Sequence, residues 1–136
     1  MKAFPFLSFN ATLLLLRVSV AFIFITHAVV RIANGTIERF ASFLESKGLP
    51  FGTVTVWCLS AFEIIGGVLL ALGYYKKWLS AGFIVILLVG IILIHASLGW
   101  FVGEHGAGGS EYSFILIVTL LVIAAGDKKE KIEVIR

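Results

Sequence analysis

Four long apolar stretches constrain the fold of this chain more than any other feature. They run over residues 11–33, 51–73, 78–97 and 110–126. A helix needs about 20 mostly apolar residues to cross a bilayer, and the fourth stretch is somewhat short for that. Each stretch is apolar on all sides, which is typical of a helix surrounded by lipid. The pattern predicts an all-α fold: a single integral membrane domain over residues 1–136, built as a four-helix bundle.

The composition excludes several other classes of protein. Hydrophobic residues make up 60% of the chain and charged residues only 14%, whereas soluble domains carry about a quarter charged residues. A disordered chain, a nucleic-acid-binding domain and a water-soluble enzyme are therefore excluded, and the expected partner is the lipid bilayer. The single cysteine, Cys58, excludes an internal disulfide and a thiolate metal cage. We expect no metal site.

A short amphipathic helix is predicted between the first two spans, over Thr36 to Lys47. Its charged residues fall away from the apolar ones, and Gly48 and Pro50 follow it. Such a helix is expected to lie on the outer membrane interface. The apolar residues at helical spacing are Ile37, Phe40, Phe43 and Leu44.

Basic residues in the short connections predict the orientation in the membrane. On the predicted outer side, the basic residues Arg39 and Lys47 are balanced by the acidic residues Glu38 and Glu45. Lysine and arginine accumulate in cytoplasmic loops, so we expect a multi-pass protein of the inner (plasma) membrane with both termini in the cytoplasm. The basic residues on the predicted cytoplasmic side are Lys2, Lys76, Lys77, Lys128, Lys129, Lys131 and Arg136.

Six ionisable residues lie within or at the ends of the predicted spans. Each charged group at the centre of a span costs roughly 2.5–3.5 kcal/mol on insertion, so such residues are usually functional. Within the first span, Arg17, His27 and Arg31 lie on one side of an α-helix. In the second span, Glu63 shares a face with small residues such as Gly67. The pattern predicts a polar seam that opens outward from mid-membrane, with Arg17 paired to Glu63. The six residues are Arg17, His27, Arg31, Glu63, His95 and Glu111.

Each of these residues also has a purely structural interpretation. An Arg17–Glu63 pair could simply hold two helices together, and His27 could donate to a backbone carbonyl. Arg31 could extend to the outer headgroups, and His95 could be an ordinary interfacial histidine. Glu104 and His105, in the glycine-rich loop before the fourth span, are interpreted as solvated.

The order and spacing of these residues resemble a known family. LLLLRVSVAFIFITHAVVRI carries an arginine, a histidine and a second basic residue, and GLPFGTVTVWCLSAFEIIGGVLLALGYYKKWLSA carries a Glu-x-x-Gly-Gly element and a basic turn. A histidine in the third span and GGSEYSFILI at the fourth complete the pattern. Together they resemble the DoxX family of small four-span membrane proteins. The chain departs from it at Ala28, where glycine is usual, at Arg31, where lysine is common, and in its charged tail.

The resemblance implies a link to redox chemistry. The family's namesakes are subunits of a thiosulfate:quinone oxidoreductase, and other members are linked to sulfur or thiol redox balance. The leading hypothesis is a subunit of a quinone-linked redox system. In it, His27 or His95 donates a hydrogen bond to a quinone carbonyl and Glu63 relays protons, whereas Arg17, Arg31 and Glu111 help to bind the quinone. No electron carrier is visible in the sequence, so electrons would come from a redox partner subunit. A non-enzymatic scaffold or assembly subunit and a small carrier remain alternatives, and the residues indicate no oligomeric state.

Overall fold

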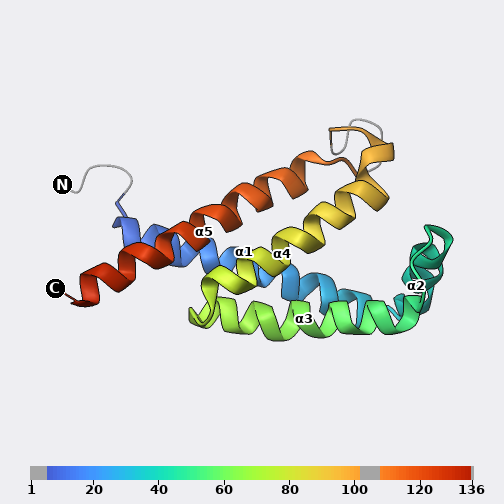
Figure 1. The fold of residues 1–136 in the computed structure, drawn as a ribbon, viewed down its shortest axis with the longest axis horizontal. Helices are drawn as coiled ribbons and strands as arrows, with labels where there is room; N and C mark the ends of the chain where they lie inside the picture. The colour runs from blue at the N-terminus through green and yellow to red at the C-terminus, as the bar shows by residue number, and fades with distance from the viewer. Residues whose placement is uncertain (1–5, 102–107, 136) are drawn as a thin grey trace.

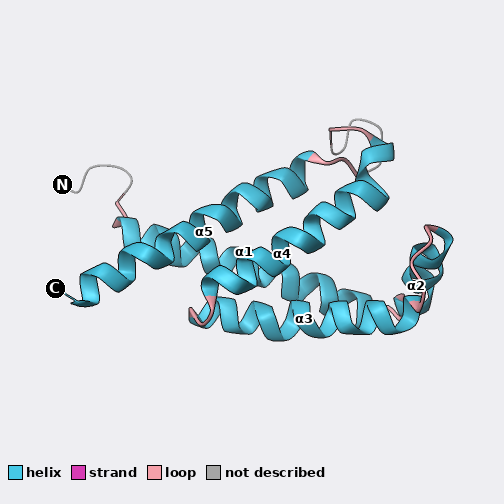
Figure 2. Cartoon of the chain, viewed as in Figure 1, coloured by secondary structure: helices cyan, strands magenta, loops and turns pink. Residues whose placement is uncertain are grey.

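The computed structural model describes residues 6–101 and 108–135, and within these ranges the chain is helical without any strand. Four long helices follow one another in alternating directions, with a short helix between the first two (Figures 1 and 2). The elements are α1 (Phe9–Ala33), α2 (Ile37–Ser46), α3 (Gly52–Leu72), α4 (Lys76–Gly90), the π-helix η1 (Ile91–His95), the 3₁₀ helix η2 (Ala96–Leu98) and α5 (Glu111–Ile135).

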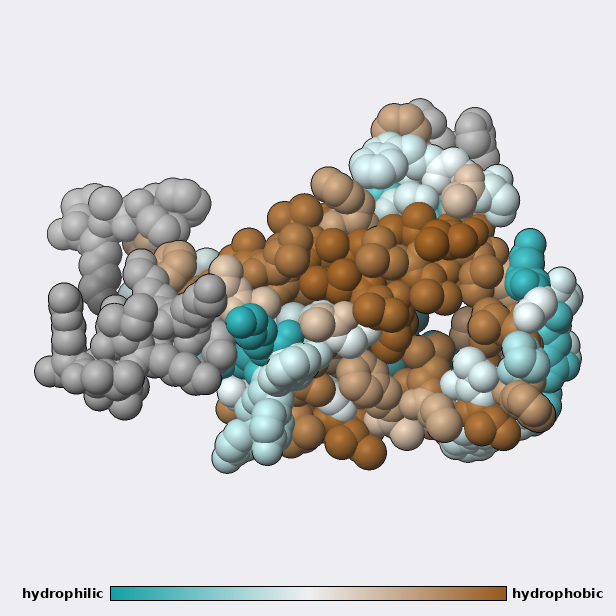
Figure 3. All heavy atoms as spheres, in the orientation of Figure 1, coloured by the Kyte–Doolittle hydropathy of each residue, from teal (hydrophilic) through white to brown (hydrophobic). Residues whose placement is uncertain are grey.

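The long helices have the length and apolarity of membrane spans. Three segments of the described chain meet both criteria, namely α1, α3 and the continuous run from α4 through η2, whereas the apolar part of α5, Glu111–Gly126, is shorter. Large apolar side chains cover the outside, including Phe22, Trp78 and Ile92, each more than two thirds exposed. Figure 3 shows this hydrophobic surface along the long helices. An apolar exterior suits lipid, and the predicted all-α membrane bundle is confirmed.

The helices form two pairs that separate toward one end. α1 packs mainly against α3 and α4 mainly against α5, whereas α3 and α4 contact each other little beyond the turn that joins them. Near that turn the pairs meet in a core where the Phe24 and Phe83 rings stack with centroids 4.1 Å apart. Toward α2 and the α4–α5 connection the pairs diverge (Figure 1). The divergence leaves room for a cavity at that end.

Small residues allow α1 and α3 to approach closely. A Cβ atom on Gly67 would lie 2.7 Å from Cγ1 of Ile25 and 3.3 Å from the carbonyl oxygen of Ala21. Glu63, one turn earlier on α3, is only 4% exposed. The small residues beside Glu63 therefore bury the carboxylate at a helix–helix contact, as their spacing predicts.

α2 is the predicted amphipathic helix, and it lies across the end of the α1–α3 pair (Figure 1). Its apolar face buries Ile37, Ala41 and Leu44 in a small cluster with Val56 of α3. The carboxylate of Glu45 accepts a hydrogen bond of 2.8 Å from the backbone N–H of Gly52. This bond satisfies one of the free amides at the start of α3 and fixes α2 to the end of the bundle.

Candidate functional site

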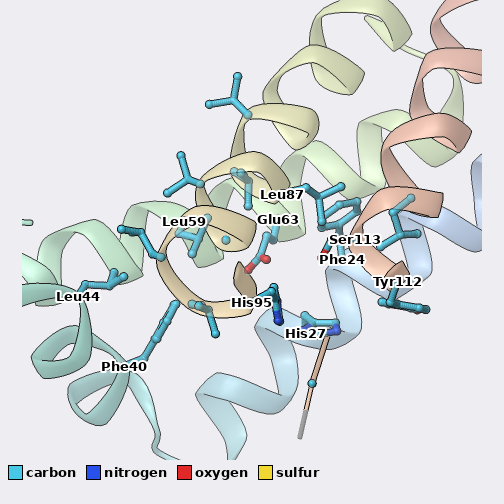
Figure 4. A pocket seen from close by; sticks show the side chains of 18 of the residues that line it. Phe24, His27, Phe40, Leu44, Leu59, Glu63, Leu87, His95, Tyr112 and Ser113 are labelled. Carbon is cyan, nitrogen blue, oxygen red and sulfur yellow. The ribbon is translucent and has the colours of Figure 1, made fainter. Parts of the chain in front are cut away.

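A cavity of about 430 Å³ occupies the space between the diverging helix pairs. All four long helices, α2 and η1 contribute to its walls, which are mostly apolar side chains such as Phe24, Leu59 and Leu87. Figure 4 shows these walls with several polar groups among them. We call it the large cavity. Its polar or ionisable lining residues are His27, Arg31, Thr55, Glu63, His95, Tyr112 and Ser113.

An ion pair joins α1 to α3 at the wall of the large cavity. Nη1 of Arg31 lies 2.7 Å from Oε2 of Glu63 and donates a second hydrogen bond, of 2.8 Å, to the Ser60 hydroxyl. The Ser60 hydroxyl in turn donates to the carbonyl oxygen of Val56. The guanidinium also stacks over the Phe40 ring of α2, 5.3 Å from its centroid. The side chains of Arg31 and Glu63 are only 13% and 6% exposed, so the pair is largely removed from solvent.

The predicted partner of Glu63 was wrong: it pairs with Arg31 and not with Arg17. Side chains on a helix tilt toward its N-terminus. In the antiparallel α1–α3 pair, Arg31 therefore points back into the bundle and Glu63 points toward the end where Arg31 lies. Arg17 is fourteen residues earlier, or about 21 Å along the axis at 1.5 Å per residue, and it tilts away from Glu63. Its guanidinium lies beside Gly73 at the far end of α3.

The two histidines in the spans line the same cavity. His27 lies one helical turn before Arg31 on α1, and His95 ends the π-helix η1. Figure 4 shows both imidazoles with Glu63 on the wall of the cavity. Nδ1 of His95 is buried and has no hydrogen-bond partner among the described residues. A buried polar atom without a partner is unfavourable unless a ligand or water satisfies it, so His95 can offer this nitrogen to a bound molecule.

The π-helix was not predicted from the sequence. Over Ile91–His95 the backbone widens from α to π geometry, and three consecutive residues, Leu93, Ile94 and His95, line the large cavity. Short π segments within α-helices occur frequently at functional sites. No residue pattern in this apolar segment signals the change, since it contains neither proline nor glycine.

The structure brings together four of the six predicted site residues: His27, Arg31, Glu63 and His95. Glu111 begins α5 and is not among the lining residues, which instead include its neighbours Tyr112 and Ser113. A shift of one residue turns a helical side chain by about 100°.

Glu104 and His105 lie outside the described residues. Within those residues no group of three or more histidine, cysteine, aspartate or glutamate side chains could hold a metal ion. Cys58 is exposed on α3.

The sequence model of the DoxX family matches residues 12–96, from the first turn of α1 to the first residue of η2. The chain belongs to the DoxX family. The matched region includes the ion pair and both histidines of the large cavity, whereas Tyr112 and Ser113 follow it. The chain is also 29% identical over 119 residues to the putative oxidoreductase CatD of Bacillus subtilis (strain 168), covering 86% of this chain and 80% of that protein. No solved structure matches this DoxX-family chain.

Proposed function

We propose that this DoxX-family membrane protein binds a lipid-soluble quinone in the large cavity, as a subunit of a quinone-linked redox system. The observation that carries the proposal is the combination of two imidazoles and a buried ion pair on the wall of a mostly apolar cavity within the helices. The name of the relative, putative oxidoreductase CatD, supports a redox role. The electrons would come from a partner subunit.

The chemistry of the cavity suits a quinone. A quinone ring is apolar on both faces and carries carbonyl oxygens that accept hydrogen bonds. Neutral imidazole has one N–H donor, so His27 and His95 can each hold a carbonyl oxygen. The volume of about 430 Å³ falls within the ~300–1,000 Å³ of small-molecule sites. The apolar walls suit the ring and the start of an isoprenoid tail, which would leave between the helix pairs.

Glu63 is the residue that we expect to handle protons. A bound quinone takes up two electrons and two protons to become a quinol. Oε2 of Glu63 accepts its hydrogen bond from Arg31, and Oε1 accepts none from the described residues. Oε1 can therefore carry a proton to the cavity while Oε2 keeps the side chain in place. Arg31 acts as a positioning residue, held by Ser60 and Phe40.

Binding is tested with the purified full-length protein in lipid nanodiscs and a short-chain quinone. We expect saturable binding, weakened about fivefold to tenfold by His27→Phe or His95→Phe, because each removes one hydrogen bond worth about 1 kcal/mol. Cys58→Ala, on the exposed surface of α3, is the control and should bind like the wild type. Absence of saturable binding, or histidine variants indistinguishable from Cys58→Ala, would overturn the proposal.

Proton transfer is tested separately with Glu63→Gln in membranes that carry the partner system. Glu63→Gln protein that circular dichroism shows to be folded should still bind quinone but lose most quinone-dependent turnover, whereas Glu38→Gln, on the exposed side of α2, should retain it. The scaffold alternative is favoured by the position of the Arg31–Glu63 pair, which joins α1 to α3. If Glu63→Gln keeps full turnover but no longer co-purifies with the partner, the scaffold alternative is supported.

We also propose that the protein lies in the inner membrane with both termini in the cytoplasm. The start of α1, the end of α5 and the α3–α4 turn with Lys76 and Lys77 share one end of the bundle (Figure 1). Positive charge concentrates on the cytoplasmic side, which supports this orientation. A green fluorescent protein fused after residue 136 should fluoresce, and alkaline phosphatase fused there should be inactive. The reverse pattern would contradict the orientation.

A further inference from the structure

One side of the large cavity continues onto the lipid-facing surface between α3 and α4. These two helices contact each other little beyond the turn that joins them, and Figure 3 shows the surface hollowed between the two helix pairs on the side of α2. Val85 and Val89 of α4 both line the cavity, yet they are 58% and 44% exposed. Leu59 of α3 and Gly90 of α4 line it as well. We call the side of the cavity formed by these four residues the lateral opening.

Gly90 is a glycine that neither its backbone nor its packing requires. Its φ and ψ are −60° and −41°, ordinary right-handed helical values that any residue can adopt. A Cβ atom added to Gly90 would meet no heavy atom of the described residues within 4 Å, whereas one on Gly67 or Gly82 would lie less than 3 Å from a neighbouring side chain. Glycine within a helix is destabilising relative to alanine. The missing side chain of Gly90 therefore leaves open space in the cavity wall.

The polar groups of α5 lie away from the lateral opening. Figure 4 shows Leu59 on one side of Glu63 and the α5 residues Tyr112 and Ser113 on the other. The side chains of the lateral opening are aliphatic, so a hydrocarbon chain that passes them displaces no hydrogen-bonded partner. Desolvating an unpaired polar group would oppose such a passage. The cavity therefore offers hydrogen-bonding groups to one part of a ligand and an aliphatic exit to another.

We propose that the hydrocarbon tail of the bound quinone leaves the large cavity through the lateral opening, and that Gly90 determines which tails the site accepts. This inference rests on the proposed function, in which the histidines hold the ring. Beyond Val85 and Val89 the tail enters the bilayer, where an isoprenoid chain is soluble. A bulky side chain at position 90 would occupy the space of the tail, and overpacking of this kind is unfavourable. Gly90 is therefore a specificity-determining residue for the tail and not for the ring.

Binding of two quinones to the full-length protein in nanodiscs tests the role of Gly90. The quinones share one ring, and their tails consist of a single isoprenoid unit or of several units. Affinities are compared as mole fractions of quinone in the lipid, so that partition into the bilayer does not contribute. Gly90→Leu should weaken binding of the long-tailed quinone about tenfold, because leucine and the tail compete for one space, and binding of the short-tailed quinone less than about twofold. Ala81→Leu is the matched control, since Ala81 is exposed on α4 and does not line the cavity, and it should change neither affinity.

Photo-crosslinking maps the path of the tail in the wild type. A long-tailed quinone with a diazirine near the ring end of its tail is bound and irradiated, and the modified residues are identified by mass spectrometry. We expect modification of Leu59, Val85 or Val89, and an excess of the unmodified long-tailed quinone should suppress it. A phosphatidylcholine with a diazirine in its acyl chain should modify these residues less once quinone is added. Lipid modification that quinone does not reduce would show that an acyl chain occupies the lateral opening, and would overturn the proposal.

The failure of this proposal can be told apart from that of the quinone site itself. If Gly90→Leu affects both quinones equally, or neither, or if the tail modifies α1 and α5 around His27 and Tyr112, the tail does not use the lateral opening while the quinone site stands. If neither quinone binds saturably to the wild type, the proposed function and the path of the tail are both wrong. If Gly90→Leu does not fold, Val89→Phe at the exposed rim decides: it should weaken the long-tailed quinone alone, and equal effects on the two quinones would contradict the proposal.

Discussion

Replacing Glu63 by glutamine should strongly destabilise the bundle, because it leaves Arg31 buried without its counter-ion. The two side chains are only 6% and 13% exposed, so the value for a buried pair applies and not that for a surface pair. Removing one member of a buried pair costs about 3–5 kcal/mol. Glutamine can still accept the hydrogen bond of 2.7 Å from Nη1. We therefore expect the lower end, about 3 kcal/mol of unfolding free energy.

A double-mutant cycle isolates the contribution of the pair. Glu63→Gln, Arg31→Met and the double variant are unfolded reversibly with sodium dodecyl sulfate in mixed micelles, and helix content is followed by circular dichroism. The double variant leaves no buried charge behind, so it should lose less stability than the two single variants together, by about 2–3 kcal/mol. The Ser60 hydroxyl still donates a hydrogen bond to the carbonyl oxygen of Val56. Losing the hydrogen bond from Arg31 to Ser60 therefore adds little to the destabilisation.

Two controls decide whether the result reports the buried pair. Glu38→Gln removes an exposed carboxylate that accepts a hydrogen bond from Thr53 at 3.0 Å, and it should change stability by less than about 0.5 kcal/mol. A second cycle between Arg17 and Glu63 should be additive within about 0.5 kcal/mol, because the two residues are far apart. Additivity for Arg31 and Glu63, or coupling for Arg17 and Glu63, would refute the assignment of partners.

Two other predictions concern packing, and both are measured as unfolding free energies in the same micelles. Gly67→Ala should cost about 1–3 kcal/mol, because the new Cβ would lie 2.7 Å from Cγ1 of Ile25 and overpacking is destabilising; Gly90→Ala has no atom within 4 Å of the new Cβ and should be neutral or stabilising. Phe83→Ala should cost about 3–5 kcal/mol, because Phe83 is fully buried between helices, whereas Val85→Ala, 58% exposed, should cost little. Equal effects within either pair would contradict the packing described.

Hydrophobicity was sufficient to predict the helices to within a few residues. The first stretch, 11–33, became α1 (Phe9–Ala33), and the third, 78–97, became the run from Lys76 to Leu98. The largest difference is at the end of α5, which continues from Gly126 to Ile135. The residues there are mostly lysine, glutamate and isoleucine, which leave the apolar pattern but do not oppose a helix. Apolarity therefore marks the membrane part of a helix and not the end of the helix itself.

The faces of the helices were also predictable, but their relative positions along the bundle were not. Periodicity placed His27 and Arg31 on one side of α1 and Glu63 beside Gly67 on α3. The pairing of Glu63 with Arg31 depends on the axial position of α3 relative to α1. That position is fixed by contacts such as the one between Gly67 and Ile25. Nothing in one helix alone contains that information. Tyr112 and Ser113 were missed for a related reason, because only the rotation of α5 in the bundle decides which residues face the cavity.

The charges on the wall of the large cavity support assigning it a neutral ligand. At the large cavity the charges of Arg31 and Glu63 cancel, and His27 and His95 in neutral form add none. A neutral molecule can enter there without an uncompensated charge, whereas an anion would compete with Glu63 for Arg31. Quinone should therefore bind equally well in nanodiscs with or without phosphatidylglycerol. Displacement of quinone by that anionic lipid would contradict the assignment of a neutral ligand.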